Sequence, residues 1–385
     1  MINNNNFIVP TAENILARYF PKYVTLRAMT NEMINHLTID PNSVYTINVY
    51  VDIYRMLLSI YHREKVTVRN YTEITSSIIN FCAHIRSFYR DKYKVHTRIF
   101  LIYNNYLETG VNLWQSNFIR GYNLDAETSI KRHTVIRNII MNNLPVIKLL
   151  CEHIEDVYFV DRPVESMITI YDLINKEQDP NIPHVIFTNC PLTIQVPVFA
   201  KNTFIFRLIK LWEKNESGEA VPVDYFTVIG RHNAIMEFTS NSRNFMVAEK
   251  LIPMINVINP ELISLFITLA GAKRKEKNIT KLMNINKLCK IMSDAVLENP
   301  TLNRYNEDIT DIYNAMKLYK LIKEVDLTLL KYRYKAIDLI SNYGIYMTTP
   351  FFNDTSYLVN IHDPETMREI NDKHFKDNPL DLERL

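Results

Sequence analysis

The sequence predicts an α/β fold: a mostly parallel, twisted sheet flanked by helices. Short apolar runs rich in Val, Ile, Phe and Tyr alternate with longer amphipathic stretches, as in successive strand–helix units. The runs are continuously apolar, which is typical of parallel strands buried on both faces. With 385 residues, 47% hydrophobic and 22% charged, the chain can bury a large core and form more than one domain.

The first predicted strand, Tyr45–Asp52, follows a helix expected over residues 11–40 and precedes a helix over Ile53–His62. Asp52 therefore lies at a strand-to-helix junction. Parallel sheets use such positions for metal or phosphate chemistry, but an aspartate there can also cap the following helix. The local sequence leaves both readings open.

The next strands follow in the same order. Helices are expected over Ile74–Tyr89 and His133–Leu150, and strands over Arg98–Tyr103 and Val157–Val160. Asn104 and Asn105 follow the second strand. The apolar run between these helices therefore ends on an amide and not on a carboxylate.

A helix is expected over Pro163–Ile174, with Glu165 in its first turn as dipole complement or metal ligand. The fourth strand, His184–Thr188, leads into Asn189, Cys190 and Pro191. Ligands and metals bind just past the carboxyl ends of such strands, and here that position holds no carboxylate.

Beyond the fourth strand, two further strands are expected at Thr203–Leu211 and Asp224–Gly230. Helices over Pro260–Leu269 and Ile279–Met292 would flank a basic turn, forming a helix-turn-helix. A turn of this kind can grip phosphates or can be a solvated loop, and both readings stay open. Its candidate DNA-binding residues are Lys273, Arg274, Lys275 and Lys277.

In the last third of the chain, apolar residues recur at helical spacing from Ile309 to Leu329, which predicts a long amphipathic helical element. A tail follows at Pro350–Leu385. The tail is expected to be irregular apart from a short helix near Pro364–Asn371. Its apolar anchors would contact a partner protein, or the tail would fold back on its own domain. The anchors are Phe351, Phe352, Tyr357 and Leu358. The expected domains are residues 1–44, 45–295 and 296–385.

Composition excludes several classes of protein. A net charge of +2 argues against a whole-surface nucleic-acid binder, and six glycines leave no Gly-rich phosphate loop. The four cysteines form no CxxC, so reduced, buried thiols and no zinc site are expected. No secretory signal or membrane-spanning run is found. Abundant Asn, Ile, Lys and Tyr suggest an AT-rich genome, as in many bacteriophages.

The order of these elements resembles the 5′-nuclease superfamily, which includes flap endonucleases and phage 5′–3′ exonucleases and is related to PIN domains. The resemblance covers roughly residues 45–295. In that family the first strand ends in an aspartate followed by a helix with an arginine, which Asp52 and Arg55 match. A Phe-Asp-Gly pattern after the second strand becomes Tyr103–Asn104–Asn105. In the family, the helix after the third strand opens with a pair of glutamates, and of this pair the chain has only Glu165.

Later motifs of the family depart further from its pattern. Where the fourth strand should run into two aspartates and a glutamine, this chain has Asn189, Pro191 and, one residue out of register, Gln195. In the helix-turn-helix, Ala272 stands where the first aspartate belongs, and Lys273–Lys275 surround the second. Such nucleases hold two or three divalent ions with about six or seven carboxylates. The resemblance therefore implies a kept fold, no expected metal beyond a weak Mg²⁺ on Asp52 and Glu165, and lost catalysis.

Three hypotheses follow. The first is a non-catalytic nuclease-fold protein that acts as a structural component of a bacteriophage particle, in a ring, connector or portal/tail assembly. The second is a DNA-binding module that contacts the phosphate backbone through the basic turn. The third is an active metal-dependent 5′ nuclease. Partners would be other structural proteins or further copies of the chain, in a virion or in the cytoplasm of an infected bacterial cell.

Overall fold

A computed structural model describes twelve stretches of the chain, which form two compact units. Unit 1 comprises Met1–Thr38, Asn112–Asp125 and Cys190–Thr349; unit 2 comprises Ile39–Val111, Ala126–Asn189 and Pro350–Leu385. The domain boundaries expected near residues 44 and 295 stay predictions. The described residues are 46–53, 71–104, 142–162, 164–188, 190–214, 218, 220–240, 251–272, 281–305, 309–315, 327–348 and 363–385.

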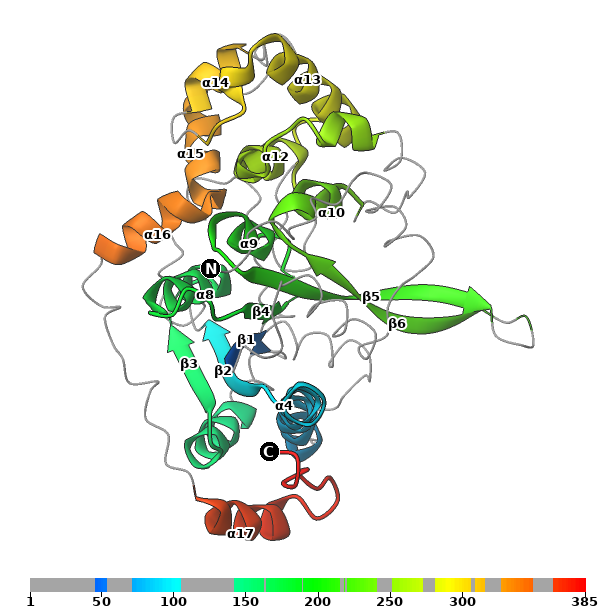
Figure 1. Cartoon of the computed structure of the whole chain (residues 1–385), viewed down its shortest axis with the longest axis vertical. Helices are drawn as coiled ribbons and strands as arrows, with labels where there is room; N and C mark the ends of the chain where they lie inside the picture. Colours follow the sequence, from blue (N-terminus) through cyan, green and yellow to red (C-terminus); the bar gives the residue numbers. More distant parts are fainter. Residues whose placement is uncertain are drawn as a thin grey trace. The chain divides into compact units, whose positions relative to one another are not determined.

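Unit 2 contains a four-stranded parallel sheet in the order β3-β2-β1-β4 (Figure 1). Its strands are β1 (Thr46–Asp52), β2 (His96–Asn104), β3 (Val157–Arg162) and β4 (His184–Phe187). The four predicted central strands are therefore confirmed as parallel neighbours. The apolar runs of β1, β2 and β4 are buried, as strands covered on both faces require, whereas Tyr158 and Phe159 of the outer strand β3 are half-buried.

One face of this sheet carries a row of aromatic side chains. Strand register aligns Tyr50 with Phe100 and Phe100 with Tyr158, and alternation places all three on the same face. The ring centroids are 5.2 Å apart between Tyr50 and Phe100 and 5.1 Å apart between Phe100 and Tyr158. Such cross-strand stacks stabilise the strand pairing beyond the area that they bury.

Helices cover both faces of the sheet. Helix α8 (Ser166–Lys176) lies on the aromatic face, since Asp172 and the C-cap residue of the helix bind side chains from β3, β2 and β1 on that face. Helix α4 (Tyr71–Tyr93) lies on the other face, where Phe81 contacts Phe187 edge-to-face at 5.2 Å. The predicted fold class, a parallel sheet flanked by helices, is confirmed. A helix over residues 142–153 and helix α17 (Pro364–His374) complete the described part of unit 2.

Unit 1 contains a long antiparallel hairpin formed by β5 (Thr203–Lys214) and β6 (Ala220–Ile229). The two strands are longer than the predicted Thr203–Leu211 and Asp224–Gly230, because they stay paired as far as Lys214 and Ala220. Gly218 follows with φ +81°, a backbone conformation that glycine adopts without strain.

The rest of unit 1 is helical. Its helices are α9 (Val196–Phe199), α10 (Ala234–Ser240), α12 (Ile263–Ala270), α13 (Ile285–Glu298), α14 (Ile309–Ala315), α15 (Leu327–Ile337) and α16 (Leu339–Thr348). Short 3₁₀ turns cover Thr193–Gln195, Arg231–Asn233, Pro260–Leu262 and Pro300–Leu302. Every residue of α12 is buried. Helix α12 confirms the first helix of the predicted helix-turn-helix. The second helix is present as α13 but begins at Ile285, six residues later than predicted, after the N-cap Asn284. The basic turn, Lys273–Lys277, lies outside the described residues.

Two other expectations also fall outside the described residues: the helix over residues 11–40 and most of the helix that begins at Ile53. None of the helices in the described ranges is long and apolar enough to cross a membrane.

Candidate functional site

The carboxyl ends of the unit 2 strands meet along one edge of the sheet. Asp52, the last residue of β1, is in register with Ile102 of β2, and Ile102 is in register with Val160 of β3. On the other side, Val51 aligns with Phe187, so Thr188 lies beside Asp52. Parallel α/β sheets place their ligands at this edge. The structure therefore puts Asp52 where a site is expected.

Asp52 is buried, with 2% of its surface exposed. The hydroxyl of Thr188 donates a hydrogen bond to its Oδ2 across 3.1 Å. This hydroxyl supplies part of the polar environment that a buried carboxylate requires. Asp52 thus has a donor from the neighbouring strand.

Glu165 lies at the second acidic position, as the N-cap residue of α8. Its backbone is extended (φ −60°, ψ 142°), so the helix begins at Ser166, three residues later than the predicted start. The amides of Ile168 and Thr169 donate to its carbonyl oxygen across 2.9 and 3.3 Å. Its side chain is 4% exposed and makes no cap hydrogen bond. The positive end of the helix favours a carboxylate here.

Asp52 and Glu165 lie on the same edge but are not adjacent. Strand β2 separates β1, which ends at Asp52, from β3, and Glu165 lies three residues beyond the end of β3 at the start of α8. Oxygen ligands of Mg²⁺ bind at about 2.1 Å in a near-octahedral shell. These two carboxylates could share at most one ion. They cannot form the pair of adjacent metal sites that two-ion catalysis needs.

Other positions of the expected cluster hold non-acidic residues. Asn104 ends β2, Pro191 lies in the turn after β4, and Ala272 is buried next to Gly271. Within the described ranges, His, Cys, Asp and Glu residues form no group of three or more that could hold a metal ion. Asn189 lies outside the described residues. So do the basic residues Lys273, Arg274, Lys275 and Lys277 and the anchors Phe351, Phe352, Tyr357 and Leu358.

Sequence patterns do not indicate the buried ion pair at the end of β3. Nη1 of Arg162 donates to Oδ2 of Asp172 across 2.6 Å, and the two side chains are 6% and 0% exposed. Lys176 binds the same carboxylate oxygen across 2.8 Å and is 41% exposed. By strand alternation, Arg162 shares a sheet face with Asp52. The Asp172 carboxylate is thus bound by two cations of the protein itself, which compete with a divalent ion for its oxygens.

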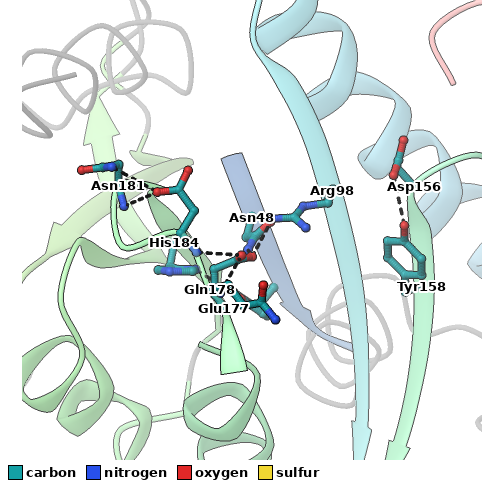
Figure 2. A network of polar contacts seen from close by, with 10 residues as sticks. Asn48, Arg98, Asp156, Tyr158, Glu177, Gln178, Asn181 and His184 are labelled. Atoms are coloured by element: carbon teal, nitrogen blue, oxygen red, sulfur yellow. Dashed lines mark hydrogen bonds and ion pairs between the residues drawn. The ribbon is translucent and has the colours of Figure 1, made fainter. Parts of the chain in front are cut away.

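A second polar cluster lies at the opposite, amino edge of the sheet and centres on Glu177 (Figure 2). Oε2 of Glu177 accepts from Nδ2 of Asn48 across 3.0 Å and from a terminal guanidinium nitrogen of Arg98 across 2.6 Å. Burial raises the pKa of Glu177, but the Asn48 hydrogen bond and the Arg98 charge outweigh it and hold the pKa below its usual value. Since Glu177 is the C-cap residue of α8, these bonds fix the end of that helix to β1 and β2.

His184 lies beside this cluster. Its Nδ1 is 3.2 Å from the Tyr50 hydroxyl, and the residue is 4% exposed. Burial, aided by the charge of Arg98, lowers the pKa of His184 from 6.5 to about 4, although Glu177 opposes the shift. The ring is therefore neutral near pH 7. A neutral imidazole cannot act as a cationic general acid, so His184 holds the sheet together and does not supply a proton.

In unit 1, Gln195, which matches a glutamine of the family motif one residue out of register, is fully buried. Its Nε2 donates to the carbonyl oxygens of Leu192 and Ile337 across 3.2 and 3.0 Å. Its Oε1 accepts from the Ser264 hydroxyl across 2.7 Å and from the Leu339 amide across 3.0 Å. All four hydrogen-bonding positions of the amide are used. Gln195 therefore acts as a structural cross-link.

Comparisons with known proteins add little to this geometry. No protein-family model matches the chain, and no curated protein matches it in sequence. Among solved structures, the chain is similar to a T5 5′-exonuclease with bound zinc ions, at 10% identity and a TM-score of 0.40. The similarity covers 77% of this chain and 91% of the exonuclease chain. A TM-score this low supports no argument about function.

Proposed function

We propose that this protein is a catalytically degenerate relative of the 5′-nuclease superfamily that serves as a structural component of a larger assembly. The composition of the carboxyl edge of the unit 2 sheet carries the proposal. There Asp52 is bound by Thr188, and β3 ends in the buried cation Arg162. The sequence motifs around Asp52 and Glu165 supply the link to the family.

The chemistry of the reaction explains why this edge would not support cleavage. Two-ion phosphodiester hydrolysis needs carboxylates that bridge two ions about 3.5–4 Å apart, so that one ion activates water and the other stabilises the leaving oxygen. Asn104 and Pro191 cannot supply the missing charge. The buried guanidinium of Arg162 binds the Asp172 carboxylate, so that carboxylate already has a cation of the protein itself as its partner. Restoring single aspartates would leave Arg162 in place.

The particle role rests on a different argument. Fold alone does not determine function, and a rigid α/β core without its catalytic ligands can be kept as a building block. The compositional likeness to AT-rich phage genomes favours a virion. Phosphate-backbone binding by Lys273, Arg274 and Lys275 is the competing function, and salt-dependent binding to duplex DNA would favour it.

A single-turnover cleavage assay tests the proposal. Micromolar protein is incubated with 5′-flap and nicked duplex DNA in the presence of Mg²⁺ or Mn²⁺. We expect no product above that of the Asp52→Ala variant. Asp161→Ala is the matched control, because Asp161 is exposed and lies on the opposite sheet face from Asp52. Cleavage that is lost in Asp52→Ala but kept in Asp161→Ala would overturn the proposal.

A further inference from the structure

The C-terminal segment, residues 363–385, lies within unit 2 and makes defined contacts there (Figure 1, red). The short helix predicted in the tail is present as α17. Of the two alternatives for the tail, binding to a partner or folding back on its own domain, residues 363–385 follow the second. Asp363 caps the helix by accepting from the amides of Glu365 and Thr366, both across 3.1 Å. Three side chains are buried: Met367, Phe375 and Leu380, at 3%, 1% and 5% exposure.

Helix α4 recognises the main chain of this segment through Asn80. Its Nδ2 donates to the carbonyl oxygen of Pro379 across 3.1 Å, and its Oδ1 accepts from the amide of Asp381 across 2.7 Å. These two groups flank Leu380, so one amide side chain holds the backbone on both sides of a buried apolar anchor. The segment supports the same turn itself, since the amide of Leu380 donates to Oδ1 of Asn371 across 2.8 Å.

Two further contacts hold the ends of the segment. Arg86, also on α4 and 8% exposed, donates to the main-chain oxygens of Leu385 and Glu155. At the other end, the amide of Asp363 donates to the carbonyl oxygen of His153 across 3.2 Å. We call the surface formed by Asn80, Arg86 and His153 the tail receptor. These hydrogen bonds from the receptor go to main-chain groups, and the apolar anchors add burial.

The connection between the segment and the preceding helix matters for what the receptor can bind. Helix α16 ends at Thr348 in unit 1, and residues 349–362 lead to Asp363 in unit 2. A connection of that length can extend to at most roughly 50 Å. The receptor contacts described above are made with residues 363–385, so the same segment of another copy would offer the receptor the same groups.

We propose that the tail receptor also binds residues 363–385 of a second copy, so that copies are linked by exchange of their C-terminal segments. This proposal deepens the assembly role and rests on it. Exchange of an identical element costs little, because the receptor makes the same hydrogen bonds whichever copy provides the tail. In dilute solution each tail docks on its own receptor, because a short connection keeps it there at a millimolar effective concentration. The exchanged form becomes more populated as the concentration of other copies approaches that value.

Two full-length variants test exchange by complementation. The recipient carries Phe375→Ala and Leu380→Ala, which remove the anchors but keep its receptor. The donor carries Asn80→Asp and Arg86→Gln, which keep its tail but disable its receptor. The Asn80→Asp carboxylate cannot donate to Pro379 and repels its carbonyl oxygen. Each variant alone should be monomeric, and an equimolar mixture should contain a 1:1 heterodimer by light scattering and native mass spectrometry.

A control and a second measurement make every outcome decisive. A recipient that also carries Asn80→Asp and Arg86→Gln should not pair with the donor. A synthetic peptide of residues 363–385 should bind the recipient, and Asn80→Asp in the recipient should weaken this binding at least about tenfold. Circular dichroism first shows that both variants are folded, and a monomeric mixture of folded variants overturns the proposal. Peptide binding without a heterodimer would show a receptor used only within one chain. Neither result depends on DNA cleavage, so failure here is distinct from failure of the non-catalytic assignment.

Discussion

Replacing Asp172 by Asn should strongly destabilise unit 2, because it leaves the buried guanidinium of Arg162 without its anionic partner. The Arg162 and Asp172 side chains are 6% and 0% exposed and lie 2.6 Å apart. Breaking a buried pair by removing one partner costs about 3–5 kcal/mol. That is a large part of the roughly 5–15 kcal/mol by which a domain is stable. Urea unfolding followed by circular dichroism, with hydrogen exchange at the α8 amides, measures the loss.

Two matched variants separate the buried pair from its exposed neighbour. Lys176→Met removes the partner that is 41% exposed and should cost at most about 1 kcal/mol. The double variant Arg162→Met/Asp172→Leu removes both buried charges and should regain most of the stability lost in Asp172→Asn. A cost of less than about 1 kcal/mol for Asp172→Asn would refute the reasoning. A double variant as unstable as Asp172→Asn would also refute it.

Three further predictions concern other buried groups. His184 stays neutral in the folded protein down to about pH 4, whereas the unfolded chain gains a proton below pH 6.5. The free energy of unfolding should therefore fall by up to roughly 3 kcal/mol between pH 6.5 and 4. This fall should be smaller in His184→Asn. It should be unchanged in the control His84→Gln, because His84 is exposed. Phe375→Ala should cost about 3–5 kcal/mol by urea unfolding, because the ring is fully buried; an unchanged midpoint would mean that the tail adds nothing to unit 2. Burial raises the pKa of the Cys82 and Cys289 thiols to about 12 and that of Cys151 well above its usual value, so native protein at pH 8 should be alkylated by iodoacetamide first at the half-buried Cys190, as mass spectrometry of tryptic peptides would show. Equal labelling of all four cysteines would contradict the described packing.

The strands of unit 2 could be predicted from the sequence because their apolar runs are continuous and each is bounded by a polar break. The same logic located Asp52 at the carboxyl edge, since a strand that ends on a carboxylate fixes where that carboxylate lies. The helix start at Pro163 was wrong by three residues, because the extended backbone of Glu165 delays the helix. Local patterns therefore sufficed wherever the deciding interaction was local.

The interactions that the sequence could not reveal join residues far apart in the chain. Asn48 and Arg98 meet Glu177 across 129 and 79 positions, and no periodicity links them. The Gln195 cross-link depends on Ser264 and on the α15–α16 junction, so a motif read along the chain could not reveal it. The tail anchors carry no regular spacing, and Asn80 recognises main-chain atoms, which any sequence provides.

Titration of the protein with Mn²⁺, followed by electron paramagnetic resonance, tests the central claim most directly. The carboxyl edge offers Asp52 at the end of β1 and Glu165 at the N-cap of α8, with Arg162 on the same sheet face as Asp52. We therefore expect no more than one ion that depends on Asp52, bound more weakly than about 1 mM. Two ions per chain bound at micromolar concentrations, and both lost in Asp52→Asn, would show a working metal centre and contradict the account.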